Sequence, residues 1–114
     1  WLGGITEQDL VERLANCRAV CYPPSAEDYG LVTLEAFASA KAVITCADSG
    51  GPAEMVRPEV DGLVAEPTAE SLAQAMRRVM DDQVLAERLG GAGRTRAAAI
   101  TWARTIPRLL GERV

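Results

Sequence analysis

Three short apolar runs alternate with segments of helical pattern, and this alternation restricts the fold more than any other feature of the chain. The runs are "AVCYP" at 19–23, "AVITC" at 42–46 and "LVA" at 63–65. Each run is short and continuously apolar, which is typical of a strand buried on both faces. Strands that alternate with helices form parallel sheets through right-handed crossovers. The sequence therefore predicts an α/β fold with a three-layer, Rossmann-like parallel sheet, its strands ordered as the runs are along the chain.

Helix signals fill the gaps between these runs. Thr6 is a suitable N-cap for a helix over 7–16, and Thr68 is a suitable N-cap for a helix after the third strand. A second helix is expected over 31–40, and "ADSGGPAEMV" at 47–56 indicates a glycine loop that enters a short helix. The helix after Thr68 carries an apolar stripe at helical spacing, which we expect to face the core. The stripe consists of Leu72, Ala75, Met76, Val79 and Met80.

The C-terminal part is expected to be helical but interrupted. A helical piece spans 83–89, and "GGAGR" at 90–94 is expected to break it, because glycine is a poor helix former. The tail over 94–112 is rich in Ala and Arg, and Pro107 should interrupt its helix. The chain is thus predicted to be one domain over 1–114, with its motifs in 1–80 and C-terminal helices in 81–114. Trp1-Leu2 is expected to add a stray fourth strand.

Composition excludes several classes of function. The chain has 114 residues, a net charge of -4, no histidine and three cysteines. The basic residues are scattered, so no nucleic-acid surface is expected, and no apolar stretch approaches the roughly 18 residues of a membrane span. The lack of histidine and of a Cys-x-x-Cys pair argues against a metal site and excludes a histidine base within this chain. The cysteines are expected to be reduced and mostly buried thiols in the cytoplasm.

The stretch "PPSAEDYGLVTLEAFASAKAVI" at 23–44 has the features of a phosphate site flanked by two acids. A loop that ends in Gly30 and enters a helix at Leu31 leaves backbone N–H groups free to bind phosphate, aided by the helix dipole. Glu27 and Glu35 would then stand on either side, where carboxylates suit pairs of sugar hydroxyls. Nucleotide-sugars have that shape. The spacing alone is equally typical of one solvated surface acid and one acid near a helix end.

The same stretch resembles the donor-site signature of the retaining glycosyltransferases with the two-Rossmann (GT-B) architecture, known as glycosyl transferases group 1. The resemblance covers about residues 1–80, and it is specific because many parts keep their order and spacing. The matching parts are Pro24-Ser25, Glu27, Tyr29-Gly30-Leu31, Glu35-Ala36, Ala42-Val43, Gly50-Gly51, Glu54, Asp61-Gly62-Leu63-Val64 and Leu72-Ala73.

The resemblance implies a role for each part. Glu27 would face the transferred sugar near the reacting carbon as the catalytic residue, and Glu35 would bind the ribose hydroxyls. Donor binding would also involve Ser25 and the backbone amides at Gly30, Leu31 and Val32. The loop of Gly50, Gly51 and Glu54 would close the crevice near the sugar or acceptor, although a plain strand-to-helix turn has the same glycines. The resemblance implies no metal and no cofactor, since the nucleotide-sugar is a substrate.

The chain departs from the family pattern at three places. Tyr29 stands where Phe is usual, and Asp28 replaces a frequent glycine and adds negative charge beside the phosphate site. Ala40-Lys41-Ala42 stands where the family often has Gly-x-Pro, so this turn should be less rigid.

The expected whole is therefore the C-terminal, nucleotide-sugar-binding part of a retaining glycosyltransferase, which moves a sugar from a nucleotide-diphosphate donor to an acceptor hydroxyl. The chain opens on Trp1 without methionine. The resemblance therefore implies that the acceptor domain and the first strands of the sheet belong to other parts of a longer protein. The isolated chain should then be inactive, and its open sheet edge should favour dimerisation or a swapped element. Any membrane association would involve only the parent's other domain.

Two alternatives remain open at this point. A sugar-nucleotide epimerase of the same architecture usually employs histidine near the phosphate site, which this chain lacks. A non-enzymatic α/β binding module is the second alternative, and the presence of both Glu27 and Glu35 argues against it.

Overall fold

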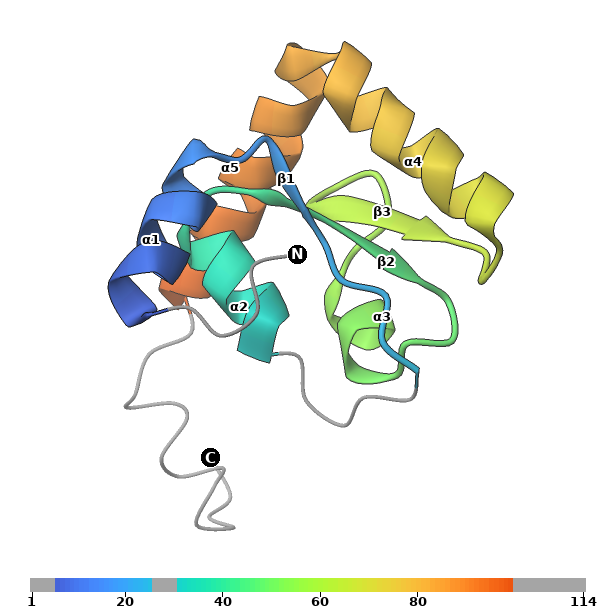
Figure 1. Ribbon diagram of the computed structural model, residues 1–114, viewed down its shortest axis with the longest axis horizontal. Coiled ribbons are helices and arrows are strands. Elements are labelled where there is room, and N and C mark those ends of the chain that lie inside the picture. The colour runs from blue at the N-terminus through green and yellow to red at the C-terminus, as the bar shows by residue number, and fades with distance from the viewer. Residues whose placement is uncertain (1–5, 26–30, 100–114) are drawn as a thin grey trace, which may run out of the picture.

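The computed structural model describes residues 6–25 and 31–99. Helices and strands alternate along the chain up to β3, and two helices follow (Figure 1). The elements are α1 (Glu7–Asn16), β1 (Ala19–Cys21), α2 (Leu31–Ala38), β2 (Ala42–Cys46), α3 (Gly51–Met55), β3 (Gly62–Ala65), α4 (Ala69–Asp81) and α5 (Gln83–Ala99). The expected strand at Trp1-Leu2, and the tail beyond Ala99 with Pro107, lie outside the described residues.

The sheet has three parallel strands in the order β1-β2-β3. Ala19 pairs with Ala42 at one end of the sheet, and Cys46 pairs with Ala65 at the other. This confirms the predicted strand order and direction. Every residue of the central strand β2 is buried, as expected for a strand with a neighbour on each side and helices on both faces.

Helices cover both faces of the sheet, giving the predicted three layers (Figure 1). On one face, α4 and the first half of α5 bury an apolar cluster that includes Val79 and Leu89 against Ile44 and Leu63. On the other face, Phe37 of α2 and Val56 after α3 pack with Val43. Strand β2 thus contributes side chains to both clusters of the core, since successive residues of a strand point to opposite faces.

The predicted caps of α1 and α4 are present. The Thr6 hydroxyl accepts a hydrogen bond from the backbone N–H of Asp9 at 3.1 Å. The Thr68 hydroxyl accepts one from the backbone N–H of Ser71, also at 3.1 Å. Each cap satisfies one of the donors that a helix start leaves free, which explains why both helices begin where the sequence indicated.

The expected break at Gly90–Arg94 is wrong, because α5 runs without interruption through these glycines. The reason is close packing. A Cβ at Gly90 would lie 2.1 Å from the carbonyl oxygen of Ala40, and a Cβ at Gly93 would lie 2.6 Å from the Phe37 ring. Both glycines therefore let α5 approach α2 closely, and the buried contact outweighs the poor helix propensity of glycine.

The turn after α2 ends the helix through a left-handed residue. Ala40 has φ of 59°, the N–H of Lys41 donates to Ala36 O at 2.9 Å, and the N–H of Ala40 donates to Phe37 O at 2.9 Å. These two bonds form the Schellman arrangement, in which glycine normally takes the left-handed position. Alanine there adopts a conformation that its Cβ disfavours.

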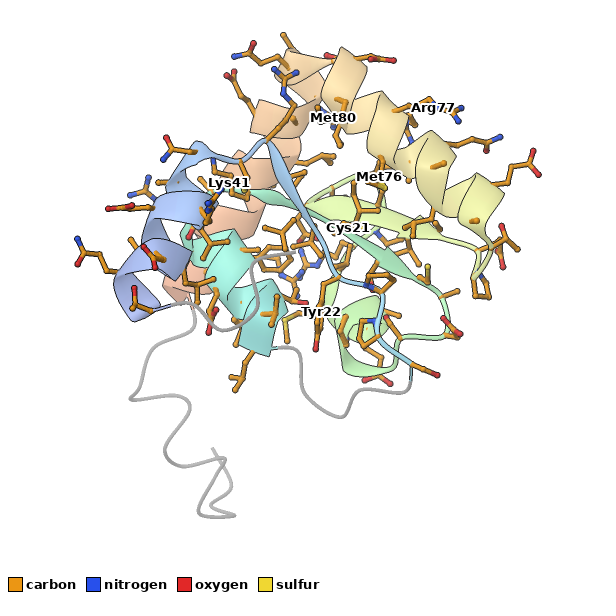
Figure 2. All side chains as sticks on the ribbon, in the orientation of Figure 1. Cys21, Tyr22, Lys41, Met76, Arg77 and Met80 are labelled. Carbon is orange, nitrogen blue, oxygen red and sulfur yellow. The ribbon has the colours of Figure 1, made fainter. Side chains whose placement is uncertain are left out.

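Two expectations about burial fail near β1. Met76 and Met80 were expected in the core, but their exposed fractions are 42% and 59%. Figure 2 shows both side chains on the side of α4 that faces the sheet. Helix α4 packs over β2 and β3, and in the described part of the chain the sheet ends at β1. The stripe on α4 is therefore wider than the sheet beneath it.

Strand β1 itself is only partly covered, contrary to the expectation that every strand is buried. Ala19 and Val20 are half-buried, and Cys21 is exposed, so the thiols are less buried than predicted. Helix α1 is also largely exposed, with Leu10 at 38% and Val11 at 60%. Helices α1 and α4 thus each carry two exposed large apolar side chains.

Candidate functional site

The carboxyl ends of β1 and β2 lie side by side, because parallel neighbours end at the same edge of a sheet. Residues 22–25 follow β1 there, and residues 47–50 follow β2. The N-terminus of α2 is at the same edge, because a helix that connects two parallel strands runs back against them. Ligands of open α/β sheets bind at this edge, so the structure brings the predicted loop and helix start together as a candidate site.

A buried pair of hydroxyls joins the two strand ends. The Thr45 hydroxyl donates to the backbone oxygen of Tyr22 at 2.8 Å and lies 2.9 Å from the Ser49 hydroxyl. A hydroxyl has a single proton, so Ser49 is the donor in the second bond. The side chains of Thr45 and Ser49 are both fully buried. This chain of bonds fixes the loop after β2 to the end of β1, at the residue just before the Gly50–Gly51 turn.

The Gly50–Gly51 turn leads into α3. Gly50 is the N-cap residue with φ of 78° and ψ of -117°, a conformation available to glycine and strained for other residues. Pro52 follows in the first turn of the helix and is buried. Glu54, also in the first turn, is exposed. Position 50 therefore requires a backbone conformation that only glycine adopts easily. The backbone N–H groups of Gly51 and Ala53, at the start of α3, have no acceptor within the helix and lie at the same edge of the sheet.

The start of α2 has the properties expected of a site for an anion. Its first four N–H groups have no acceptor within the helix. Leu31 is 61% exposed, and Val32 is half-buried. The Thr33 hydroxyl is fully buried and, among the described residues, is the buried side-chain oxygen that lacks a hydrogen-bond partner. Glu35 is exposed one turn further along the same helix, so its carboxylate is free to meet a ligand.

Of the other predicted site residues, the structure describes Ser25 but not Glu27 or Gly30. Ser25 is exposed at the end of the segment after β1. Glu27 and Gly30, the predicted catalytic acid and the glycine before the helix, lie outside the described residues. The structure thus places Leu31, Val32, Ser25 and the Gly50–Gly51 turn at one edge of the sheet, with Glu35 one turn along α2 from that edge.

The thiols at this edge are poorly suited to act as nucleophiles. Burial raises the pKa of Cys46, and the charges of Asp48 and Glu66 raise it further. Cys21 is exposed as a residue, but partial desolvation of its thiol also raises its pKa, with a smaller contribution from Cys46. A thiol must lose its proton to attack or to bind a metal, so both groups stay in the inert form at neutral pH. In residues 6–25 and 31–99, no three His, Cys, Asp or Glu side chains gather as metal ligands would.

A crevice of about 240 Å³ lies at the opposite edge of the sheet, beside Arg18 and Lys41 at the amino ends of β1 and β2. Asn16 and Glu87 also line it. Because it faces away from the Gly50–Gly51 turn and the start of α2, this crevice is not part of the candidate site.

Sequence reasoning missed Thr45 and Ser49. The signal for Thr45 was a single polar residue within the apolar run "AVITC", and the signal for Ser49 was a serine directly before two glycines. A polar residue within a buried strand needs a partner, and the residue four positions later supplies it.

The model of one protein family matches residues 1–96, and its description is "Glycosyl transferases group 1". The chain belongs to this family. The match includes all three strands and most of α5, and it confirms the resemblance drawn from the motifs. Residues 22–54, which carry the candidate site, lie within the matched region.

Individual relatives agree with this assignment. Human alpha-1,3/1,6-mannosyltransferase ALG2 is 32% identical over 84% of this chain and 23% of its own length. Sucrose-phosphate synthase from Thermosynechococcus elongatus superposes with a TM-score of 0.84 and 33% identity over 96% of this chain and 28% of that chain. Anabaena HepE in complex with UDP-glucose has the same fold, with a TM-score of 0.75 and 23% identity over 86% of this chain and 27% of that chain. The chain thus spans about a quarter of the length of these proteins.

Among the described helices, none has the length and apolar character needed to cross a lipid bilayer.

Proposed function

We propose that the protein containing this chain is a retaining glycosyltransferase that transfers a sugar from a nucleotide-diphosphate sugar to an acceptor hydroxyl. The chain would supply the donor-binding edge of its C-terminal domain. The observation that carries the proposal is the exposed Glu35, one turn into a helix that starts at the edge where β1 and β2 end. Family membership and the UDP-glucose complex of HepE, which has the same fold, support the class of donor.

The donor's diphosphate would bind at the start of α2. Free N–H groups and the helix dipole favour negative charge there, and the backbone of Gly30, Leu31 and Val32 would hold the distal phosphate. Glu35 lies one turn further along α2 than Leu31, and its two carboxylate oxygens suit the two ribose hydroxyls. Glu27 would stand on the sugar side of the diphosphate, beside the carbon at which positive charge develops as the diphosphate leaves. Its negative charge would then stabilise the transition state more than the ground state.

The acceptor would be held by another domain of the protein, so the isolated chain should not transfer sugar. Holding both reactants in position contributes about 7–11 kcal/mol to lowering the barrier, and that contribution needs both sites. The proposal includes no metal and no cofactor, as the family resemblance implies, and the backbone N–H groups and the helix dipole would stabilise part of the phosphate charge. We place the reaction in the cytoplasm, on the grounds that Cys17, Cys21 and Cys46 are all free thiols.

The first test concerns Glu35 in the full-length protein. If Glu35 holds the ribose equally in the ground and transition states, Glu35→Ala should raise KM for the donor by about tenfold to a hundredfold, for the loss of ~1.5–3 kcal/mol in charge-assisted hydrogen bonds. The value of kcat should change little. Glu12→Ala is the matched control, because Glu12 is an exposed acid on α1 away from this edge. Steady-state kinetics with the donor varied separates the two outcomes, and an unchanged KM in Glu35→Ala would contradict the ribose contact.

The second test concerns Glu27. Glu27→Gln keeps the size and removes the charge, so it should lower kcat and leave donor binding nearly intact. A kcat within about twofold of the parent, less than ~0.5 kcal/mol of barrier, would show that Glu27 does not stabilise the transition state. Donor affinity measured by calorimetry in the same variants checks binding independently of turnover.

A further inference from the structure

Arg96 on α5, whose side chain is 27% exposed, contacts three separate parts of the chain. One guanidinium nitrogen, Nη1, lies 2.6 Å from a carboxylate oxygen of Asp61 and 2.5 Å from the backbone oxygen of Met55. The guanidinium also lies over the Phe37 ring, with its carbon 5.6 Å from the ring centroid. Arg96 therefore contacts the end of α3, the turn before β3 and the last turn of α2 at once.

Asp61 makes this contact rigid. Its side chain is fully buried, and its second carboxylate oxygen accepts the backbone N–H of Arg57 at 2.7 Å. A buried carboxylate has few alternative positions, because it needs both its hydrogen bonds and its counter-charge. Arg96 is the cation that forms the salt bridge with Asp61 in the described part of the chain. The Arg96–Asp61 pair thus fixes the connection between α3 and β3 to helix α5.

Helix α3 depends on such outside contacts. It has 5 residues, far below the roughly 12–15 at which an isolated helix becomes even marginally stable. The buried bond between Thr45 and Ser49 fixes the loop at its beginning, and Arg96 binds the carbonyl of Met55 at its end. Because both ends of α3 are held, the orientation of the Gly50–Gly51 turn at the sheet edge is fixed.

Two other arginines contact the same turn without reaching α3. Arg78 on α4 forms a salt bridge with Glu59 at 2.8 Å, with the two side chains 48% and 56% exposed. Arg88 on α5 donates to the backbone oxygen of Glu59 at 3.4 Å. Exposed pairs of this kind contribute little to stability or position. Arg78 is therefore a matched control for Arg96.

We propose that Arg96 is a positioning residue: by binding the Met55 carbonyl and Asp61, it sets the orientation of α3 and hence of the Gly50–Gly51 turn at the donor site. Its effect on donor use rests on the proposed function, whereas its effect on α3 does not. The two can therefore be tested apart, by amide hydrogen exchange for the helix and by donor kinetics for the site.

The experiment compares three variants of the full-length protein by hydrogen-exchange mass spectrometry. Arg96→Met removes the contact but leaves Asp61 without its counter-charge, which can unfold the domain. The double variant Arg96→Met/Asp61→Asn removes both charges together, and the new amide keeps an oxygen acceptor for the Arg57 N–H. Arg78→Met is the control. In the double variant we expect peptides over 50–57 to exchange about tenfold faster or more, by local opening of α3, while peptides over 42–46 keep their protection. Arg78→Met should leave both regions unchanged.

Four results decide the proposal. Protection of 50–57 that returns to the parent level in the double variant would overturn it, because Arg96 would then serve only as the counter-ion of Asp61. Faster exchange that spreads equally over 42–46 would overturn it as well, since the effect would be general instability. Faster exchange confined to 50–57, together with kcat/KM for the donor reduced by about tenfold, is the expected result. Local exchange with unchanged kinetics would contradict the role proposed for the Gly50–Gly51 turn, and would leave the contact between Arg96 and α3 standing.

Discussion

Two adjacent glycines in α5 should respond in opposite ways to the same substitution. Gly90 and Gly91 are both inside the helix, so replacing either with alanine should gain about 1 kcal/mol of helix propensity. At Gly91 the new methyl group would meet nothing within 4 Å. At Gly90 it would lie 2.1 Å from Ala40 O and 2.7 Å from Ala40 C. These are backbone atoms, which cannot move aside as a flexible side chain can.

The magnitude follows from the difference between the two sites. The propensity gain is common to both variants and cancels, so their difference in unfolding free energy measures the cost of the clash. Overpacking costs ~1–3 kcal/mol, and contact with backbone belongs at the upper end of that range. Gly91→Ala should therefore be stabilised by about 1 kcal/mol, and Gly90→Ala should be destabilised by about 2 kcal/mol. Urea denaturation followed by circular dichroism gives both values, provided that the m-value is unchanged. If the two variants were equally stable, the close approach of α5 to the turn after α2 would be wrong.

Four further outcomes are expected. Thr33→Val, which removes a buried hydroxyl without a partner, should raise the unfolding free energy by about 1 kcal/mol in chemical denaturation. Ala40→Gly should also stabilise, by up to ~1 kcal/mol, because glycine adopts the left-handed conformation without the steric cost; no gain would contradict the φ of 59° at this residue. Since its pKa is raised, Cys21 should require a higher pH than a free cysteine for half-maximal alkylation by iodoacetamide. The isolated chain should dimerise or swap an element through its open sheet edge, and a sharp monomer by light scattering at high concentration would count against this.

The parts of the fold that the sequence predicted correctly are those controlled by local signals. The N-caps at Thr6 and Thr68 act on residues three positions away, and the apolar runs that became β2 and β3 are continuous in the chain. Their order along the chain also determined their order in the sheet, because short right-handed crossovers place consecutive parallel strands side by side.

The features that were predicted wrongly depend on contacts between distant residues. Gly90 and Gly93 look like helix breakers in sequence, and only their packing against Ala40 and Phe37 explains why α5 continues. The same holds for the contact between Arg96 and Asp61, which are 35 positions apart and carry no local signal of their pairing. The site was predicted as a set of motifs, but the bond between Thr45 and Ser49 that supports its loop was not.

The exposed methionines show what a helical pattern can establish and what it cannot. The spacing of the stripe on α4 correctly predicts which side of the helix is apolar, since Ala75 and Val79 on that side are buried. Whether a stripe is covered depends on the width of the sheet beneath it, and Met76 and Met80 are exposed where the described sheet ends at β1. Exposed Leu10 and Val11 on α1 add apolar surface on a second element near that strand. Because the chain spans only about a quarter of the length of its relatives, we expect these positions to be covered by additional strands in the full-length protein.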